Sequence, residues 1–496
     1  MQQQRPLEDA IIRLAPRWDG LLVLLLAALT LPLNAAITAA AGLEMHFDEA
    51  QYWEWSQQLD WGYYSKGPLI AWLIAAGEAL FGHGEWQTRL FGWLAHAITI
   101  VLVFHFARQL WQSRRAAWWA TLLFATTPLY FVLSLVMTTD NLMLLFWTWA
   151  LWASYRALIL NREKAWYECG AAIGLGALTK LSIGLLPFII GLLVLGQKQW
   201  WHHLRSPHLW LSLLLMVALM SPMLIWNFNN DWVMLRHDSA HVASDGLSIE
   251  SLVTFVAGQF IVLSLVIAII ASWALLKKAP NEGARFLKLI TFGLMAFFLW
   301  KASGGKIQVN WAAATYISLL ILTAGLTIHM GRRLRTALVA GVALSLLFTS
   351  ALLFPKQFGF SGLQDPFKKN KYWRAPLAEL ASQLPKADFI LTDTYHLAAE
   401  LAYYWPESLP VYITGSSHRR YNQHDLWPSI AREEGKSALY IIARPDTHPS
   451  LDSAFKECEL KATLPVKAWD GEIVRTLRGY HCEGYRHIAW PQPNRY

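Results

Sequence analysis

The chain has 496 residues, of which 55% are hydrophobic and only 15% charged, a balance too apolar for an ordinary soluble enzyme. Its formal net charge of +8 comes from basic residues in short clusters between apolar stretches, which indicates orientation in a membrane rather than nucleic-acid binding. The 27 tryptophans fit a chain that crosses many membrane–water interfaces, where the indole ring is favoured.

The first apolar stretch, Gly20 to Ala41, is long enough to cross a bilayer as a helix. A cleaved signal peptide is the alternative, although a signal core is about half that length. Further apolar stretches bring the total to about eleven crossings, which predicts a polytopic α-helical membrane protein. They run over 90–111, 116–136, 141–155, 166–178, 183–195, 209–226, 252–276, 286–300, 311–329 and 334–354.

The basic residues predict the orientation of these crossings, because Lys and Arg concentrate in cytoplasmic loops. If the amino terminus is cytoplasmic and the crossings alternate, every inner loop is basic, for example Arg114-Arg115 and Arg332-Arg333. The outer loops then hold fewer cations and more carboxylates and aromatic side chains. They are the Asp48 region, Thr138–Asn141, Thr179-Lys180, Asn227–Ser248 and Lys301–Asn310. With an odd number of crossings, the chain after Phe354 lies outside.

The polar, proline-containing segment 355–496 reads as a separate small α/β domain behind a transmembrane domain 1–354. Asp388–Thr394, Val411–Thr414 and Ala438–Ala443 have the pattern of strands, and His396–Trp405 has that of a helix. No glycine-rich phosphate loop opens this helix, which argues against a nucleotide site.

Three cysteines are too few for a disulfide framework. Cys169 lies in an apolar stretch and reads as a small core residue. Cys458 and Cys482 both lie in the predicted outer domain, where disulfides persist, so we expect them to be bridged.

The first predicted outer loop, residues 42–87, concentrates ionisable and aromatic side chains where a membrane meets water. It contains Met45-His-Phe-Asp-Glu-Ala-Gln-Tyr-Trp-Glu-Trp55, followed by Asp60-Trp-Gly-Tyr-Tyr-Ser-Lys-Gly-Pro68. Ionisable residues at the outer ends of spans indicate a site of reaction at the outer surface.

The patterns Phe-Asp-Glu-Ala-x-Tyr-Trp-x-Trp and Gly-Tyr-Tyr-x-x-x-Pro-Leu-Ile-Ala-Trp resemble the first outer loop of the protein O-mannosyltransferase-like glycosyltransferases. These enzymes have the C-type glycosyltransferase fold and include the bacterial aminoarabinose transferases that modify lipid A. Leu401–Trp405 and Arg420–Trp427 resemble tail motifs of the same bacterial transferases. The resemblance implies an inverting enzyme of the bacterial inner membrane with a periplasmic tail.

Such an enzyme moves one sugar from a polyprenyl-phosphate donor to an outward-facing acceptor. Lipid A, a lipopolysaccharide core, another glycan and a protein all remain open as the acceptor. A transporter or lipid flippase is the alternative from another class, although no half-chain repeat typical of transporters is visible. An oligosaccharide ligase, which needs a pyrophosphate donor, is the alternative within glycan chemistry.

Three acidic residues are candidates for catalysis, because the transfer needs a base for the acceptor's proton. The resemblance places the family's catalytic aspartate on Asp48. Its neighbour Glu49 is either a helper or the start of a surface helix, whose first turn favours acids. Asp140, in Thr138-Thr-Asp-Asn141, resembles a family Thr-Asp step and is either a second acid or a helix cap.

The departing phosphate needs cations, and Lys66 and Arg236 are the candidates. Lys66 lies in Tyr63-Tyr64-Ser65-Lys66-Gly67-Pro68, which resembles a family stretch that often reads Tyr-x-x-Lys-Pro or Tyr-x-His-Pro-Pro, so Tyr63 and Tyr64 are substrate-binding candidates as well. In aminoarabinose transferases an acid precedes this lysine, so Ser65 is a departure. Lys66 could instead be an interfacial lysine that reaches toward water. Lys306, in another outer connection, is either a phosphate or sugar ligand or a flanking cation.

We expect no resident cofactor and assign no metal ligands. His46-x-Asp48 could form half of a metal site, but the rest of such a site is missing. His237 and His241 could bind substrate or metal, and no third ligand accompanies them.

Overall fold

The computed structural model describes residues 16–242, 246–329, 331–415 and 421–493. The chain folds into two compact units. The bundle unit comprises Met1–Ile37, Leu90–Met220 and Ser244–Phe348. The loop–tail unit comprises Thr38–Arg89, Ser221–Ala243 and Thr349–Tyr496, so it combines the predicted outer loop with the tail.

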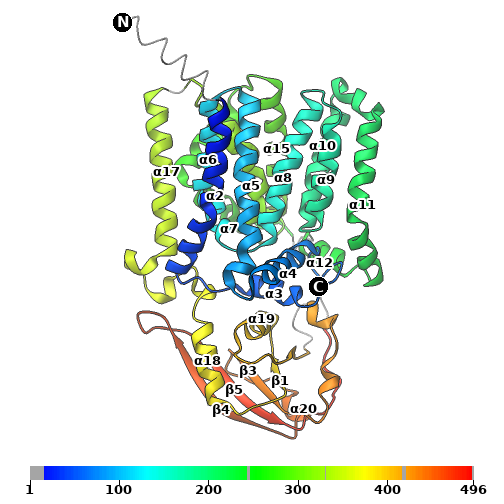
Figure 1. The fold of residues 1–496 in the computed structure, drawn as a ribbon, viewed down its shortest axis with the longest axis vertical. Helices are drawn as coiled ribbons and strands as arrows, with labels where there is room; N and C mark the ends of the chain where they lie inside the picture. The colour runs from blue at the N-terminus through cyan, green and yellow to red at the C-terminus, as the bar shows by residue number, and fades with distance from the viewer. Residues whose placement is uncertain (1–15, 243–245, 330, 416–420, 494–496) are drawn as a thin grey trace, which may run out of the picture. The chain divides into compact units, whose positions relative to one another are not determined.

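The bundle unit is helical (Figure 1). Four of its helices, α2, α5, α11 and α17, also contribute residues to the loop–tail unit. The helices are α2 (Pro16–Ala40), α5 (Glu85–Trp111), α6 (Arg114–Thr126), α7 (Pro128–Leu135), α8 (Thr139–Leu158), α9 (Ala165–Ala177), α10 (Leu185–Gly196), α11 (Pro207–Asn229), α13 (Ile249–Leu263), α14 (Leu265–Leu276), α15 (Glu282–Ser303), α16 (Ala313–Gly325) and α17 (Arg332–Leu353). Short 3-10 helices connect them at η1 (Leu181–Gly184), η2 (Lys198–Arg205) and η3 (Val309–Ala312).

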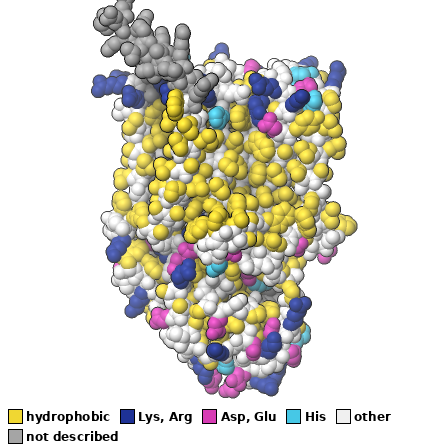
Figure 2. Space-filling view, viewed as in Figure 1, with side chains coloured by type: hydrophobic (Ala, Val, Ile, Leu, Met, Phe, Trp, Pro, Cys, Tyr) yellow, Lys and Arg dark blue, Asp and Glu magenta, His cyan; other side chains and the backbone are white. Residues whose placement is uncertain are grey.

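Within the described residues, five helices are long and apolar enough to cross a membrane, namely α2, α5, α11, α15 and α17. The number rises to eight if each of three bent helix pairs forms one span. Figure 2 shows a broad belt of hydrophobic side chains over the helices, as expected for a surface that faces lipid. These helices agree with the predicted polytopic α-helical membrane protein.

Two apolar stretches that look continuous in the sequence are broken helices in the structure. The stretch 252–276 forms α13 and α14, and the chain bends by 105° between these two helices. Ser264 between them has φ +67°, a left-handed conformation that ends the first helix. The stretch 116–136 forms α6 and α7, bent by 61° where Pro128 occupies the first turn of the second helix.

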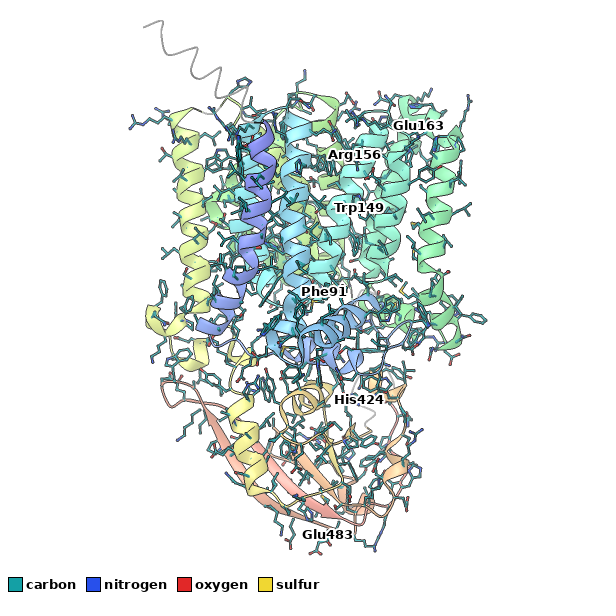
Figure 3. All side chains as sticks on the ribbon, in the orientation of Figure 1. Phe91, Trp149, Arg156, Glu163, His424 and Glu483 are labelled. Carbon is teal, nitrogen blue, oxygen red and sulfur yellow. A yellow bond between two sulfur atoms is a disulfide. The ribbon has the colours of Figure 1, made fainter. Side chains whose placement is uncertain are left out.

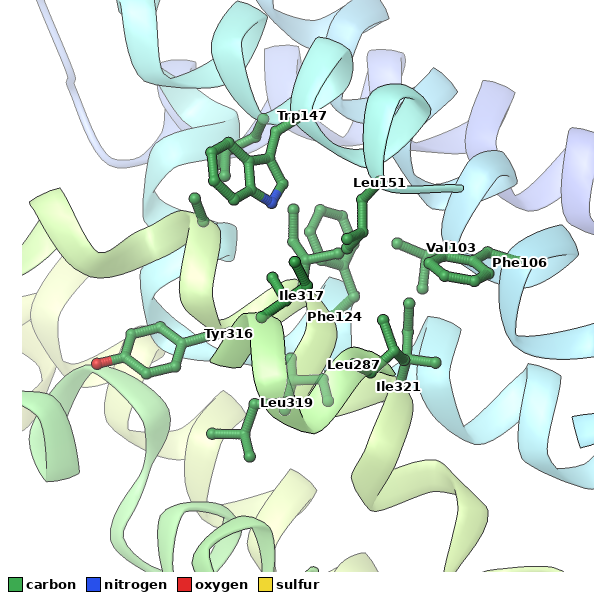
Figure 4. Packing of buried hydrophobic residues seen from close by; sticks show 14 of the residues in the cluster. Val103, Phe106, Phe124, Trp147, Leu151, Leu287, Tyr316, Ile317, Leu319 and Ile321 are labelled. Carbon is green, nitrogen blue, oxygen red and sulfur yellow. The ribbon is translucent and has the colours of Figure 1, made fainter. Parts of the chain in front are cut away.

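The core of the bundle unit is built from large apolar side chains packed between helices (Figure 4). Trp147 and Leu151 of α8 and Ile317 and Ile321 of α16 are all buried there. Close approach requires small residues: a Cβ added to Gly325 would lie 2.3 Å from the ring of Trp111. Helix packing through small residues is typical of membrane proteins.

The loop–tail unit contains a five-stranded mixed sheet of order β2-β1-β3-β5-β4. Strand β1 (Phe389–Thr392) pairs in parallel with β2 (Val411–Ile413) and β3 (Ala438–Ile442). These three strands and helix α19 (Tyr395–Tyr404) lie where the sequence predicts them. The antiparallel hairpin of β4 (Glu457–Lys467) and β5 (Ile473–Glu483) was not predicted.

The predicted disulfide is confirmed: it joins Cys458 of β4 to Cys482 of β5, which face each other across the hairpin. Cys169 is free and buried, as expected. The remaining helices of this unit are α3 (Phe47–Ser56), α4 (Leu69–Phe81), α12 (Val233–Val242), α18 (Arg374–Gln383) and α20 (Leu451–Ala454), with 3-10 turns η4 (Pro355–Phe358), η5 (Gly362–Gln364), η6 (Lys368–Asn370), η7 (Gln423–Asp425) and η8 (Ile430–Glu433).

The outer loop and the tail share one hydrophobic core. Met45 and Ala50 from the loop pack in the same cluster as Leu397 and Leu401 of α19. Figure 1 shows α19 beside α3. The tail therefore supports the helix that carries the predicted catalytic aspartate.

Candidate active site

Asp48 lies in the first turn of α3, whose start is fixed by a capping box. His46 Nδ1 accepts the Asp48 N–H at 3.2 Å, and Glu49 Oε2 accepts the His46 N–H at 3.0 Å. Burial lowers the pKa of His46, although Asp48 and Glu49 act in the opposite direction. The Asp48 side chain is 42% exposed and lies 3.6 Å from this imidazole. It is a carboxylate in a fixed place that solvent can reach.

Glu49 is fully buried and forms an ion pair with Arg89. Arg89 donates to both carboxylate oxygens, at 2.9 and 3.0 Å, and to the carbonyl oxygens of Leu43 and Glu44. Bidentate pairs of this kind are among the most rigid polar contacts in proteins. Both oxygens of Glu49 are engaged, so the pair fixes the start of α3. Sequence reasoning missed Arg89, whose only signal is its place at the outer end of a predicted span.

Tyr63 and Tyr64 pack against the carboxyl end of α3. Tyr63 is fully buried, stacks on Trp55 with ring centroids 4.6 Å apart, and donates its hydroxyl to the Trp55 carbonyl at 3.0 Å. Tyr64 meets Trp55 edge to face at 6.1 Å and the ring of His237 at 5.2 Å. Tyr63 is thus part of the framework, and Tyr64 links the outer loop to α12.

Lys66 and Arg236 lie on segments that this link joins. Lys66 is half-buried, and the Tyr63 N–H closes its turn by donating to the Lys66 carbonyl at 3.0 Å. Arg236 is exposed on α12, directly before the His237 that contacts Tyr64. The two candidate phosphate ligands therefore belong to neighbouring segments. The side chain of His241 lies outside the described residues, as does Arg420 of the tail motif.

The tail motif Leu401–Trp405 contributes a polar contact to the loop. The Tyr404 hydroxyl accepts the Met45 N–H at 2.8 Å and donates to Glu85 Oε1 at 2.7 Å. Burial raises the pKa of Tyr404, so the hydroxyl keeps the proton that it donates. The motif could be recognised in the sequence, but its contact with the loop could not.

Asp140 lies in the bundle unit, in the first turn of α8. It is 6% exposed, and its carboxylate accepts from Lys180 Nζ at 2.7 Å and from Asn310 Nδ2 at 3.0 Å. Three predicted outer connections of the bundle unit therefore meet at one ion pair. Lys306, also in this unit, is exposed.

In the part of the chain that the structure describes, no group of three or more His, Cys, Asp or Glu side chains is arranged to hold a metal ion. The half site His46-x-Asp48 thus gains no further ligand among these residues.

Comparison with known proteins shows that this chain is similar to membrane glycosyltransferases. A family model described as dolichyl-phosphate-mannose-protein mannosyltransferase matches residues 65–226. The lipid A galacturonosyltransferase RgtD of Rhizobium johnstonii is 29% identical over 368 residues, which cover 72% of this chain and 76% of that protein. The chain is thus similar to glycosyltransferases of this kind over most of its length. The predicted resemblance to this family and the predicted enzyme class are thus confirmed.

A second relative and a solved structure support the same enzyme class and the same fold, respectively. An undecaprenyl phosphate-alpha-4-amino-4-deoxy-L-arabinose arabinosyl transferase of Pseudomonas aeruginosa is 30% identical over 171 residues, about a third of each chain (31%). The crystal structure of ArnT from Cupriavidus metallidurans superposes with a TM-score of 0.67 at 17% identity, covering 91% of this chain and 97% of that one. The shared fold confirms a multi-pass helical membrane protein.

Proposed function

We propose that the protein is an inverting glycosyltransferase that moves a single sugar from a polyprenyl-phosphate donor to an acceptor at the outer face of the bacterial inner membrane. The observation that carries the proposal is the partly exposed Asp48 carboxylate, held in the first turn of α3 by the buried Glu49–Arg89 pair. The names of the relatives support this donor and an acceptor of the lipid A class. ArnT from Cupriavidus metallidurans, which has the same fold and is 16% identical to this chain, has been crystallised with undecaprenyl phosphate.

The proposed orientation has a cytoplasmic amino terminus. Residues 1–354 form the membrane domain, and residues 355–496 form a periplasmic domain. The Cys458–Cys482 disulfide supports the second assignment, because disulfides persist in the periplasm and are rare in the cytoplasm.

In the proposed mechanism Asp48 takes the proton from the acceptor hydroxyl as its oxygen attacks the anomeric carbon of the sugar. The bond from this carbon to the phosphate oxygen breaks, and its electron pair leaves with the phosphate. Attack opposite the leaving group inverts the anomeric centre. Lys66 and Arg236 neutralise the departing phosphate, which needs no strong acid because a phosphate is a good leaving group.

The length of α3 fits these roles. Asp48 and Trp55 are seven residues apart on one helix, or about 10 Å along its axis. The Lys66 turn follows the tyrosines that pack on Trp55, at the opposite end of α3 from Asp48. A donor with its phosphate toward Lys66 can place its sugar toward Asp48.

The other candidate residues take supporting roles in this proposal. Glu49 and Tyr63 position the base and the turn, because their polar atoms are engaged inside the framework. Tyr64 lies beside the proposed phosphate site, because Lys66 is two residues away and the Tyr64 ring contacts His237, the neighbour of Arg236. In the bundle unit, Asp140 holds three outer connections together, and exposed Lys306 remains a candidate ligand for phosphate or sugar.

The decisive experiment incubates detergent-purified protein with defined polyprenyl-phosphate sugars and a panel of acceptors that includes lipid A. We expect transfer of one sugar with an inverted anomeric configuration. Binding or translocation of lipid without transfer would replace the proposal with a flippase. Transfer only from a pyrophosphate-linked donor would replace it with a ligase.

A further inference from the structure

A short tail segment, Asn422 to His424, is built rigidly and reaches the outer loop. Asn422 and Asp425 form a capping box around η7: Asp425 Oδ2 accepts the Asn422 N–H at 2.9 Å, and Asn422 Oδ1 accepts the His424 N–H at 2.9 Å. Asn422 and Gln423 are 1% and 2% exposed. Polar side chains buried to this degree need partners.

One hydrogen bond and one close polar contact connect this segment to the outer loop. Gln423 Oε1 accepts the buried backbone N–H of Tyr64 at 2.9 Å. His424 Nε2 lies 3.3 Å from Glu54 Oε2 of α3, with both side chains largely buried. His424 is labelled in Figure 3. Gln423 thus holds the turn that ends in Lys66, and His424 contacts the helix that carries Asp48.

We propose that Gln423 is a positioning residue for the donor phosphate, which it serves by fixing the Tyr63–Lys66 turn. The inference rests on the proposed function, because it assigns Lys66 to that phosphate. The turn has one internal backbone bond, from the Tyr63 N–H to the Lys66 carbonyl. The Gln423 amide supplies the next anchor, one residue along. Without it the turn loses the hydrogen bond from the Tyr64 N–H to Gln423 and is held less firmly.

The effect should fall on donor binding more than on proton transfer, because Asp48 is fixed separately by His46 and by the Glu49–Arg89 pair. A Gln423→Met variant has nearly the same shape and lacks the acceptor oxygen. We expect it to raise the donor KM about tenfold and to change turnover at saturating donor by less. Gln423→Glu keeps an acceptor oxygen for the Tyr64 N–H, so it should restore slow exchange of this amide, while its negative charge opposes binding of the phosphate.

The chain offers a matched control in Gln364, whose Oε1 accepts the Ser361 N–H at 3.0 Å elsewhere in the tail. Gln364→Met removes the same kind of bond and should leave the donor KM unchanged. Hydrogen exchange gives a readout that does not depend on activity: the peptide that contains Tyr64 should exchange faster in Gln423→Met than in the wild type. Binding of undecaprenyl phosphate alone, without any acceptor, is a second readout that does not depend on activity, and it should be weaker in Gln423→Met.

The outcomes separate the inference from the proposed function. An active wild type with an unchanged donor KM and unchanged Tyr64 exchange in Gln423→Met would overturn the inference alone. Equal losses in Gln423→Met and Gln364→Met would also overturn it, because they would indicate general weakening of the tail. A wild type that neither binds undecaprenyl phosphate nor transfers sugar would overturn the proposed function, and the inference with it.

Discussion

Asp48 and Asp140 look alike in the sequence, because each begins a helix in a predicted outer connection. In the structure the Asp48 side chain is 42% exposed, whereas the Asp140 side chain is 8% exposed and lies 2.7 Å from Lys180 Nζ. A base must reach its substrate, and a buried carboxylate must be neutralised by partners. Exposure therefore separates the proposed base from an aspartate that holds the framework together.

The Glu49–Arg89 pair makes the same point inside the loop. Glu49 adjoins Asp48 in the sequence, yet it is fully buried and bonded to a guanidinium 40 residues away. Of two adjacent carboxylates, one faces solvent and the other anchors the helix. The comparison predicts that substitutions at exposed and buried acids damage different properties, turnover in one case and stability in the other.

The largest effect should come from Asp48→Asn, which keeps the shape of the side chain and removes its basicity. General-base assistance is worth roughly a hundredfold to ten-thousandfold in rate, and we expect the transfer rate to fall by that factor. Lipid-donor binding and thermal stability should stay near the wild type. Asp452→Asn, which changes an exposed aspartate in the first turn of α20, is the matched control. Near-normal turnover in Asp48→Asn would remove it as the base.

Glu49→Gln should cost stability rather than chemistry. It leaves the buried Arg89 without its counter-charge, a change worth about 3–5 kcal/mol in the free energy of unfolding. The measurement is thermal unfolding of detergent-purified protein. The double variant Glu49→Gln, Arg89→Met should recover part of the loss. A stable Glu49→Gln protein with a large loss of turnover would instead give Glu49 a direct part in the reaction.

Asp140→Asn tests whether the buried aspartate of the comparison serves stability rather than catalysis. It keeps a hydrogen-bonding side chain but leaves Lys180 without a charge partner, so we expect a loss of about 3 kcal/mol, the low end of the range for a broken buried pair. Turnover per folded molecule should fall far less than in Asp48→Asn. If Asp140→Asn unfolds normally and loses turnover as Asp48→Asn does, Asp140 is a second catalytic acid.

Lys66→Ala and Arg236→Ala should weaken use of the donor without unfolding the protein. Each removes one charged contact to phosphate, worth about 1.5–3 kcal/mol. Donor KM and binding of undecaprenyl phosphate measure the loss. Lys436, an exposed tail lysine paired with Glu433, offers the control substitution Lys436→Ala. If both variants use donor like the wild type, the phosphate assignment is wrong.

The smallest change at neutral pH should follow from Glu400→Gln. Glu400 of α19 is fully buried and neither carboxyl oxygen has a hydrogen-bond partner within the described residues. Burial raises its pKa well above the usual 4.5, against the opposing field of Arg475 and together with Glu44, Glu49 and Glu85. The folded state therefore holds a proton that the unfolded state releases.

This contribution to stability is complete below the unfolded pKa and is lost as pH rises toward the folded pKa. Thermal unfolding across pH 4 to 8, a range of about four pH units that starts just below the unfolded pKa, should show a shallower decline in Glu400→Gln than in the wild type. Identical pH profiles would mean that Glu400 is ionised in the folded protein.

Much of the fold follows from local patterns in the sequence. Apolar length predicts the membrane helices, and short apolar runs predict β1, β2 and β3. The β4–β5 hairpin was missed because much of β4 is exposed and shows no continuous apolar pattern. The breaks at Ser264 and Pro128 were missed because hydropathy measures composition and carries no information about backbone direction.

The sequence by itself determined the family resemblance, the membrane character and the loop that holds Asp48. Only the tertiary structure decided which polar groups are paired. Glu49 and Arg89 are 40 residues apart, as are Asp140 and Lys180, and Gln423 is 359 residues from Tyr64. Periodicity reports only the neighbours of a residue along a helix or strand. Partners this distant meet because burial of the surrounding apolar surface brings them together and then strongly favours pairing of the enclosed charges and amides.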